Sequence, residues 1–283
     1  MSLPLKVDLT DKVAVITGGG GVLCSAFAKA MAECGAKIAL LNREFATAQA
    51  VADEINAAGG VAKAYKCDVL DKDTLETAHT QVLADLGPCD ILINGAGGNN
   101  ARAQTGKEYY EPGDLMDPST KSFFNLDEAG VEAVFNLNFM GTLLTTQVFA
   151  VDMVERKKGN ILNISSMNAF TPLTKIPAYS AAKASVSNFT QWLAVHFSKV
   201  GIRVNALAPG FFSTTQNSSL LWNADGTPTE RTNKILSSTP MGRMGTPDEL
   251  LGAVLFLVSD EAASFVDGIV LAVDGGFSAY SGV

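Results

Sequence analysis

Near its amino end the chain reads Val13-Ala14-Val15-Ile16-Thr17-Gly18-Gly19-Gly20-Gly21-Val22-Leu23-Cys24, and this run is the strongest indication of the fold. Its apolar, β-branched start predicts a buried strand over Val13–Thr17, and the residues after the glycines predict a helix over Val22–Glu33. Glycines at such a junction let the backbone approach a pyrophosphate, and the helix amino terminus supplies free N–H groups. Glycine turns also occur for steric reasons alone. The position directly after the first buried strand favours a dinucleotide-binding turn.

The same alternation of strand and helix continues to the end of the chain. Nearly continuous apolar strands separated by helices indicate a parallel sheet covered on both faces. With right-handed crossovers, this predicts an α/β, Rossmann-like, doubly wound sheet of seven strands in one domain, residues 1–283, with ligands at the carboxyl ends of the strands. Further strands are predicted over Lys37–Leu41, Val61–Lys66, Ile91–Ile93, Asn160–Ser165, Arg203–Leu207 and Gly268–Val273, and further helices over Glu44–Ala58 and Asp71–Leu86.

Composition excludes several classes of protein. The net charge is −8 and the longest basic cluster is Arg156-Lys157-Lys158, so we expect no nucleic-acid partner. We see no apolar stretch near the roughly 20 residues that span a bilayer, and no signal peptide, so we expect no membrane association. The four cysteines lack CxxC spacing, which favours reduced thiols and a cytoplasmic location. Two histidines, His79 and His196, give little basis for a metal site, and none is predicted.

Two stretches interrupt the alternation. Residues 98–127 form a polar insertion with scattered Gly and Pro, and residues 211–246 form a second one with weak helical character. Both are expected over the carboxyl edge of the sheet. Long loops in compact domains are usually functional or disordered. The second is predicted to be a substrate lid, with a plain surface loop as the alternative.

The end of the second strand bears on the choice of cofactor. A carboxylate there would accept hydrogen bonds from the ribose diol and repel a 2′-phosphate, but the chain has Asn42 followed by Arg43. NAD(P)(H) is therefore expected, with NADP(H) favoured, although Arg43 could instead stack on adenine or point to solvent. After the third strand, Asp68 and Val69 would border the adenine. Asp68 could equally cap the helix that starts near Asp71.

The chemical centre is predicted from three residues. Tyr179 and Lys183 are four residues apart in a helical run, so their side chains share a helix face. Ser166 ends the fifth strand, which brings a hydroxyl to the same sheet edge. A tyrosine that acts as acid or base near neutral pH needs its pKa lowered by about three units, or about 4 kcal/mol. We expect the Lys183 ammonium and a positive nicotinamide to provide this stabilisation.

These residues identify a family resemblance over essentially the whole chain. The chain resembles the short-chain dehydrogenase/reductase family, which implies an oxidoreductase acting on CH–OH groups and a homotetramer with the apolar carboxyl tail (Phe277, Tyr280, Val283) in an interface. The motifs are the glycine turn Thr17–Cys24, Asn94-Gly95-Ala96-Gly97, Asn160–Ser166, Tyr179-Ser180-Ala181-Ala182-Lys183, Gly201–Asn205, Ala208-Pro209-Gly210 and Val273-Asp274-Gly275-Gly276.

The resemblance also implies roles for single residues. Tyr179 would be the acid/base, Ser166 would position the carbonyl, Lys183 would hold the nicotinamide ribose, and Asn138 would anchor a proton-relay water. Two features depart from the family pattern. Val22 and Cys24 replace the last two glycines of the turn, and Gly95 follows Asn94 where Asn-Asn is usual. The cofactor-binding residues expected in all are Thr17, Gly18, Gly19, Gly20, Gly21, Val22, Leu23, Asn42, Arg43, Asp68, Val69, Asn94, Gly95, Ala96, Tyr179, Lys183, Pro209, Gly210, Phe212 and Thr214.

Longer strings, such as NISSMNAFTPLTKIPAYSAAKA and DGGFSAYSGV, resemble a branch of the family that includes D-mannonate oxidoreductases, or fructuronate reductases. That resemblance implies a sugar-acid substrate, and an acidic chain should concentrate its positive potential in the cleft that binds one. A gluconate 5-dehydrogenase, a 3-oxoacyl reductase and a dinucleotide-binding regulator without catalysis are the alternatives. Candidate substrate residues are Asn99, Asn100, Arg102, Lys121, Ser166, Asn168, Lys175 and Arg231, and for any one of the cations ordinary surface charge is the alternative.

Overall fold

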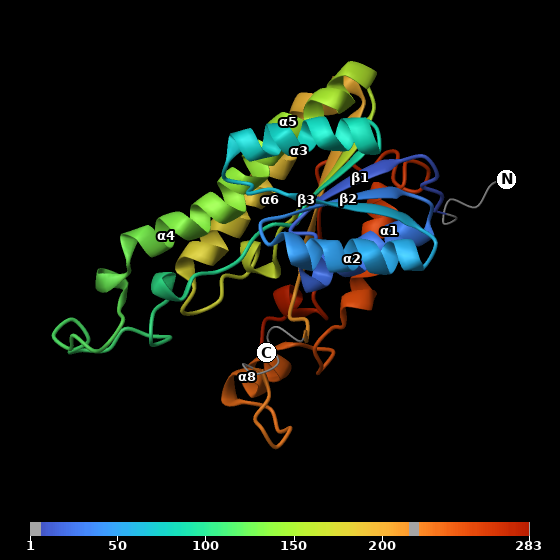
Figure 1. Cartoon of the computed structure of the whole chain (residues 1–283). Coiled ribbons are helices and arrows are strands. Elements are labelled where there is room, and N and C mark those ends of the chain that lie inside the picture. The colour runs from blue at the N-terminus through green and yellow to red at the C-terminus, as the bar shows by residue number, and fades with distance from the viewer. Residues whose placement is uncertain (1–6, 215–220, 283) are drawn as a thin grey trace.

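The computed structural model describes residues 7–214 and 221–282, and within them seven strands form one sheet. The order is β3-β2-β1-β4-β5-β6-β7, and every neighbouring pair is parallel, so the predicted doubly wound sheet is confirmed (Figure 1). The order reverses between β1 and β4, which opens a crevice at their carboxyl ends. The strands are β1 (Val13–Thr17), β2 (Lys37–Asn42), β3 (Val61–Lys66), β4 (Ile91–Asn94), β5 (Gly159–Ile164), β6 (Ile202–Pro209) and β7 (Val270–Val273).

Alternate side chains of the central strands enter two different cores. In β1, Ala14 and Ile16 join the core beneath one face, whereas Val13 and Val15 join the core on the other. This is the two-residue period of a strand, applied to a sheet that is buried on both sides. Figure 1 shows the sheet between its helix layers, with α1 (Val22–Glu33), α2 (Phe45–Ala57) and α9 (Leu251–Val258) on one face and α3 (Lys72–Asp85), α5 (Gly141–Arg156) and α6 (Pro177–Phe197) on the other.

One long helical rod corrects a sequence-based expectation. Helix α4 (Glu128–Phe135), the π-helical turn η3 (Asn136–Met140) and α5 run without a break from Glu128 to Arg156, and this rod is long and apolar enough to cross a membrane by length and composition. The expectation that no stretch approaches this limit was therefore wrong. Half of its most apolar window is buried inside the fold, which is what the core helix of a globular domain also shows.

The two interrupting stretches leave the body of the molecule in different ways. Residues 98–127 contain only short 3₁₀ turns, η1 (Ala101–Ala103) and η2 (Phe123–Asn125), and much of this stretch projects away from the sheet beyond α4 (Figure 1, green). The expected position over the sheet edge applies only to its base. The second stretch carries α8 (Glu230–Ser238), shown in orange, and residues 215–220 of the predicted lid lie outside the described residues.

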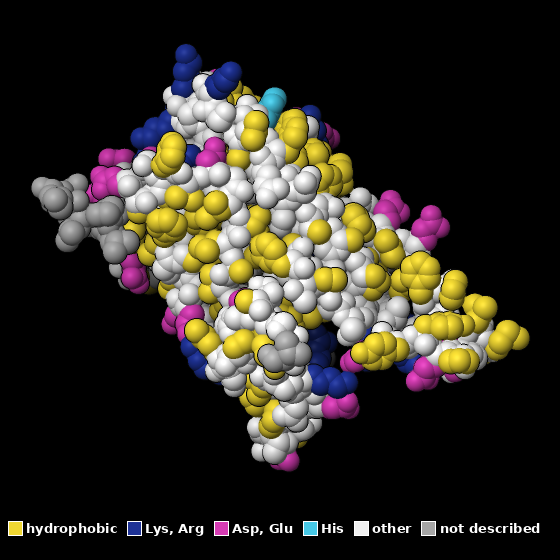
Figure 2. All heavy atoms as spheres, turned by 180° about the vertical axis from the view of Figure 1, so that it is seen from behind, with side chains coloured by type: hydrophobic (Ala, Val, Ile, Leu, Met, Phe, Trp, Pro, Cys, Tyr) yellow, Lys and Arg dark blue, Asp and Glu magenta, His cyan; other side chains and the backbone are white. Residues whose placement is uncertain are grey.

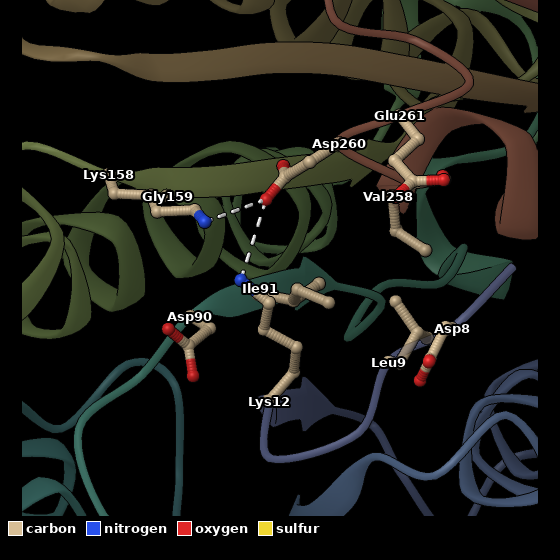
Figure 3. A pocket seen from close by; sticks show the side chains of 11 residues that line it. Asp8, Leu9, Lys12, Asp90, Ile91, Lys158, Gly159, Val258, Asp260 and Glu261 are labelled. Atoms are coloured by element: carbon tan, nitrogen blue, oxygen red, sulfur yellow. Dashed lines mark hydrogen bonds and ion pairs between the residues drawn. The ribbon is translucent and has the colours of Figure 1, made fainter. Parts of the chain in front are cut away.

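The opposite, amino edge of the sheet holds a charged pocket of about 250 Å³, shown in Figure 3. Lys12 and Lys158 each place the ammonium 3.4 Å from one carboxylate oxygen of Asp260. Asp90 is bound by Arg156 at 2.6 Å. Because these charges pair with one another, the pocket offers no clear preference for an anion or a cation.

Candidate active site

The glycine turn packs so closely that side chains would not fit. Gly18 has φ +66°, and a Cβ there would lie 3.1 Å from the Ala96 backbone. A Cβ on Gly20 would lie 2.3 Å from Oγ1 of Thr47, at the start of α2. Gly21 caps α1 without a side-chain hydrogen bond, so the first N–H groups of that helix face the crevice uncapped. A turn of this kind at a helix amino terminus fits a dinucleotide pyrophosphate.

The two departures from the family pattern contact each other. A Cβ on Gly95 would lie 2.2 Å from Cys24 Sγ, so the Cys24 thiol fills the space that a side chain at position 95 would need. Burial raises the pKa of Cys24 to about 12, which keeps it a neutral packing group. The larger Cys24 and the smaller Gly95 compensate for each other, so the turn still packs against the end of β4. Val22 is the first residue of α1.

Residues after the second and third strands lie on the adenosine side of the crevice. The Asn42 amide donates to Glu44 O and Thr47 Oγ1, which fixes the start of α2. Arg43 is exposed and lines a cavity of about 440 Å³ together with Leu70, Gly98, Asn99 and Asn100. Asn99 and Asn100 therefore lie beside Arg43 and do not line the cavity between the lid and α6 described below.

Asp68 does not cap α3. Asp71 is the N-cap, accepting hydrogen bonds from the N–H groups of Asp73 and Thr74, while Asp68 accepts one from Leu70 N. The alternative that Asp68 caps this helix was therefore wrong, because α3 begins at Lys72 and Asp71 occupies the capping position. The Asp68 carboxylate stays partly exposed beside β3 and Val69, where an adenine amino group is expected.

Tyr179 and Lys183 lie on the first turns of α6, which packs against the end of β5. The Lys183 ammonium is 5.7 Å from the centre of the Tyr179 ring and donates to Ile164 O at 2.8 Å. The Ser166 hydroxyl lies near enough to the Tyr179 phenol to favour a lower pKa of that phenol. Ser166 also accepts from Asn168 N at 3.3 Å, as the N-cap of η4 (Met167–Ala169). Phenol, hydroxyl and ammonium are thus brought together as the sequence predicts.

Asn138 lies fully buried in η3, and its side-chain amide is engaged by the backbone. Nδ2 donates to Gly98 O and Val134 O, and Oδ1 accepts from Gly98 N. A Cβ on Gly97 would lie 2.7 Å from Asn138 Oδ1 and 3.1 Å from Lys183 Nζ. Asn138 therefore positions the loop after β4 against Lys183. Its relay water stays a prediction.

The pKa directions correct one expectation. Burial raises the pKa of Tyr179, and the Ser166 hydroxyl opposes this only in part. Burial also lowers the pKa of Lys183 to about 8. In the chain alone the pKa of Tyr179 is therefore raised and not lowered as expected, because the loss of water around the phenolate outweighs the stabilisation that its neighbours provide. A bound oxidised nicotinamide would add a positive charge that favours the phenolate.

A cavity of about 550 Å³ opens between the lid, the base of the insertion and the loop before Tyr179. Three cations line it, namely Lys175, Arg231 and Lys234. Lys234 is ion-paired with Glu108 at 3.0 Å and Glu230 at 3.3 Å. Lys175 and Arg231 have no ion-pair partner within residues 7–214 and 221–282. Figure 2 shows Lys and Arg side chains in and beside the hollow between the lid and the projecting insertion.

The other predicted substrate residues separate into two groups. Arg102 is bound to Asp127 at 2.8 Å, and Lys121 is exposed on the insertion, so neither lines this cavity. Asn168 is 4 % exposed, and its Oδ1 is buried without a hydrogen-bond partner two residues from Ser166. A buried acceptor of this kind is costly unless a ligand donates to it.

The region after β6 contains the remaining cofactor candidates. Pro209 ends β6, and a Cβ on Gly210 would lie 2.6 Å from the Asp274 backbone, so glycine is required there. Phe212 pairs with Gly245 in an isolated bridge, which ties the two ends of the lid together. Thr214 is the last described residue before the gap at 215–220.

Sequence reasoning missed several residues of the cavity wall. Gln104, Glu108, Phe211, Lys234 and Phe277 come from four separate segments. Glu108 and Lys234 are 126 residues apart in the chain, so no local pattern links them. The only sequence feature that could have indicated these residues is the position of both insertions after strands that end at the carboxyl edge.

Comparison with known proteins identifies the class of enzyme that this fold and site define. A family model described as short chain dehydrogenase matches residues 12–224. The chain belongs to the short-chain dehydrogenase family, and it is an oxidoreductase with a dinucleotide-binding fold. Within the described residues, no group of His, Cys, Asp and Glu side chains could hold a metal ion.

Three known proteins are similar to this chain over nearly its full length. An uncharacterized oxidoreductase of Haemophilus influenzae is 58% identical over 283 residues, which cover 100% of this chain and 99% of the relative. A crystal structure from the same species, provisionally named a D-mannonate oxidoreductase and containing NAD, is 57% identical, with a TM-score of 0.94 and full coverage of both chains. A gluconate 5-dehydrogenase from Burkholderia cenocepacia, in complex with NADP and tartrate, is 31% identical over 98% of both chains, with a TM-score of 0.80.

Proposed function

We propose that the enzyme interconverts a sugar-acid ketone and its alcohol with NAD(P)(H), and that its substrates are D-fructuronate and D-mannonate. The observation that carries the proposal is a pair of cations, Lys175 and Arg231, that have no ion-pair partner among the described residues and line one cavity beside the loop that leads to Tyr179. A carboxylate at one end of a polyhydroxy chain would bind these cations. The buried Asn168 Oδ1 would accept a hydrogen bond from a substrate hydroxyl.

The residues of the chain supply the proton chemistry of this reaction. A bound reduced dinucleotide would supply the hydride, held by the glycine turn and the amino terminus of α1. In the direction of reduction, the Tyr179 phenol donates its proton to the carbonyl oxygen as the carbon receives the hydride. Ser166 donates a hydrogen bond that orients the oxygen, and Lys183 stabilises the phenolate that remains. In the direction of oxidation, the same phenolate accepts the alcohol proton.

The substrate class can be tested with pairs of compounds that differ only in the carboxylate. Purified enzyme would be supplied with hexuronic and aldonic acids, and with sugars of the same skeleton lacking the acid, while reduced nicotinamide is monitored with both cofactors. We expect turnover with D-fructuronate or D-mannonate, and at least a tenfold lower kcat/KM for the neutral compounds. Equal rates with neutral and acidic compounds would refute a sugar-acid substrate.

Substitutions of Lys175 and Arg231 test whether these two residues bind the substrate carboxylate. Lys175→Gln and Arg231→Gln should each raise KM for the acids by about tenfold, the effect of losing roughly 1.4 kcal/mol of charge-assisted hydrogen bonding. They should leave KM for any neutral substrate unchanged. Lys121→Gln is the matched control, because Lys121 is an exposed cation outside the cavity. If it changes KM as much as the two cavity variants do, the effect is one of net charge and not of a site.

Gluconate 5-dehydrogenase activity is the second candidate. The relative from Burkholderia cenocepacia carries that name and contains tartrate, itself a hydroxy acid. The same cations would serve gluconate, so gluconate belongs in the substrate panel. A 3-oxoacyl reductase or a regulator without catalysis gains no support from this cavity, since neither requires two free cations beside an assembled Ser166, Tyr179 and Lys183.

The preference for NADP(H) rests on Arg43, whose exposed guanidinium has no described ion-pair partner at the cavity beside the end of β2. The Haemophilus structure contains NAD, so both dinucleotides require measurement. Arg43→Ala should weaken NADP(H) binding more than NAD(H) binding, measured by fluorescence titration. Equal weakening would mean that Arg43 does not contact a 2′-phosphate.

Further proposals concern assembly and location. We propose a homotetramer, acting on small molecules in the cytoplasm without nucleic-acid or membrane partners. In the described part of the carboxyl tail, Phe277 packs on Phe211 within the chain, whereas Tyr280 is half exposed and free to join an interface. Val283 lies outside the described residues. The molar mass by light scattering tests the tetramer.

A further inference from the structure

Residues 107–125 of the first insertion, called the arm here, are held together by hydrogen bonds and an ion pair among their polar side chains. The side chain of Asp114 is 7% exposed, with its carboxylate 2.8 Å from Lys107 Nζ. Asp117 accepts hydrogen bonds from Ser119 and Thr120. These bonds fix a compact element that has no apolar core of its own.

The large apolar side chains of the arm are exposed. Tyr110 and Phe124 meet edge to face at 5.9 Å, and Phe124 meets Phe123 at 5.5 Å. Figure 2 shows apolar side chains covering much of the arm where it projects from the body. Contiguous exposed apolar surface of this kind marks an interaction site. The exposed fractions are Tyr109 77%, Tyr110 57%, Leu115 60%, Met116 85%, Phe123 69% and Phe124 64%.

A matching apolar surface lies at the opposite end of the helical rod. Val151 and Val154 on α5, and Trp192 and Val195 on α6, are 39–77% exposed and lie near the carboxyl ends of their helices. These four residues are called the receptor patch here. The two helix ends adjoin, because the strands that follow them bond to each other at Gly159 and Gly201.

Charge distinguishes the two ends as well. The arm has four acidic and two basic side chains. Lys157 and Lys199 flank the receptor patch, and both are exposed without an ion-pair partner in the described chain. The arm joins the amino end of a rod of 29 residues, about 44 Å long. Arm and patch on one chain are therefore too far apart to meet.

We propose that the arm of one subunit packs on the receptor patch of a second copy of this chain. A twofold axis across the middle of the rod sets two rods antiparallel, so that each arm reaches the other subunit's patch. Aromatic side chains then cover Val151, Val154, Trp192 and Val195, and the acidic arm meets Lys157 and Lys199. The inference concerns the pairing of subunits and does not depend on which substrate the enzyme uses.

Interchain crosslinking tests the contact directly. A Met116→Cys/Val195→Cys variant should form a covalent dimer with a short bismaleimide, seen on a denaturing gel. Met116→Cys/Val61→Cys is the matched control, since Val61 is 48% exposed on β3, outside the patch. Absence of a dimer with the first pair, or equal dimer with both, would overturn the proposal.

Measurements of the oligomeric state test whether the arm stabilises the assembly. Met116→Glu/Phe123→Glu should raise the concentration at which the assembly dissociates at least tenfold, measured by light scattering on the full chain. The replaced side chains are already exposed in the single chain, so folding should persist and circular dichroism should match wild type. Phe45→Glu, on the exposed surface of α2, is the control and should change nothing. Wild-type assembly of the arm variant at every concentration would contradict the inference.

Discussion

Burial moves the pKa values of Tyr179 and Lys183 in opposite directions, upward for the phenol and downward for the ammonium. Both shifts favour the neutral form, so in the chain alone burial disfavours ionisation of both groups. A positively charged nicotinamide would favour the phenolate. The proposed acid/base role of Tyr179 would therefore depend on the bound dinucleotide as well as on Lys183.

Removal of the Tyr179 hydroxyl should stop the proton transfer and leave dinucleotide binding unchanged. We expect Tyr179→Phe to lower kcat at least a hundredfold, in line with general acid–base contributions, while fluorescence titration shows unchanged dinucleotide affinity. Tyr109→Phe, an exposed tyrosine of the arm, is the control and should retain full activity. Activity within tenfold of wild type in Tyr179→Phe would exclude the phenol as the acid.

Lys183 gives a pH-dependent effect on stability. Its pKa falls from about 10.5 in the unfolded chain to about 8 in the folded one, so the cost of burying the ammonium is complete below pH 8 and disappears as the pH approaches 10.5. Relative to Lys183→Met, wild type should therefore gain about 3 kcal/mol of unfolding free energy between pH 7 and 10.5. Denaturant unfolding at several pH values measures this gain. A constant difference across that range would show that the ammonium is not desolvated.

At the element scale, the β4 end and α1 fit together through Cys24 and Gly95. A Cβ at position 95 overlaps the Cys24 sulfur, and overpacking of this kind typically costs about 1–3 kcal/mol. We expect Gly95→Ala to lose stability by that amount and Cys24→Ala/Gly95→Ala to recover most of it, in a double-mutant cycle of denaturant unfolding. Additive losses would mean that the two positions are independent.

Most elements are predictable from the sequence, because the strands are buried on both faces and therefore apolar throughout. The first strand, the first helix and the third strand have the predicted bounds, and the ends of the other predicted elements differ by one or two residues. Helix α3 begins after Asp71 because that carboxylate caps it, which only the cap geometry decides. The arm escaped prediction because an element with apolar side chains outside follows neither strand nor helix periodicity.

For the whole molecule, dinucleotide binding should raise the melting temperature. A ligand at a hundred times its Kd adds about 2.7 kcal/mol, which corresponds to a rise in Tm of about 5 °C for a chain of this size. NADH and NADPH titrations by differential scanning fluorimetry measure this, and Tyr179→Phe should show the same rise. No rise at saturating concentrations of either dinucleotide would contradict the assigned crevice.

The strands, the glycine turn and the grouping of Ser166, Tyr179 and Lys183 could all be predicted from the sequence, because each strand, turn or helix depends on residues close together in the chain. Which cations are paired within the molecule follows only from the folded arrangement. Arg102 is paired with Asp127 and Lys234 with Glu108, whereas Lys175 and Arg231 have no ion-pair partner among the described residues. The tertiary structure also decided the direction of the catalytic pKa shifts, since desolvation depends on everything packed around a group and not on its neighbours in sequence.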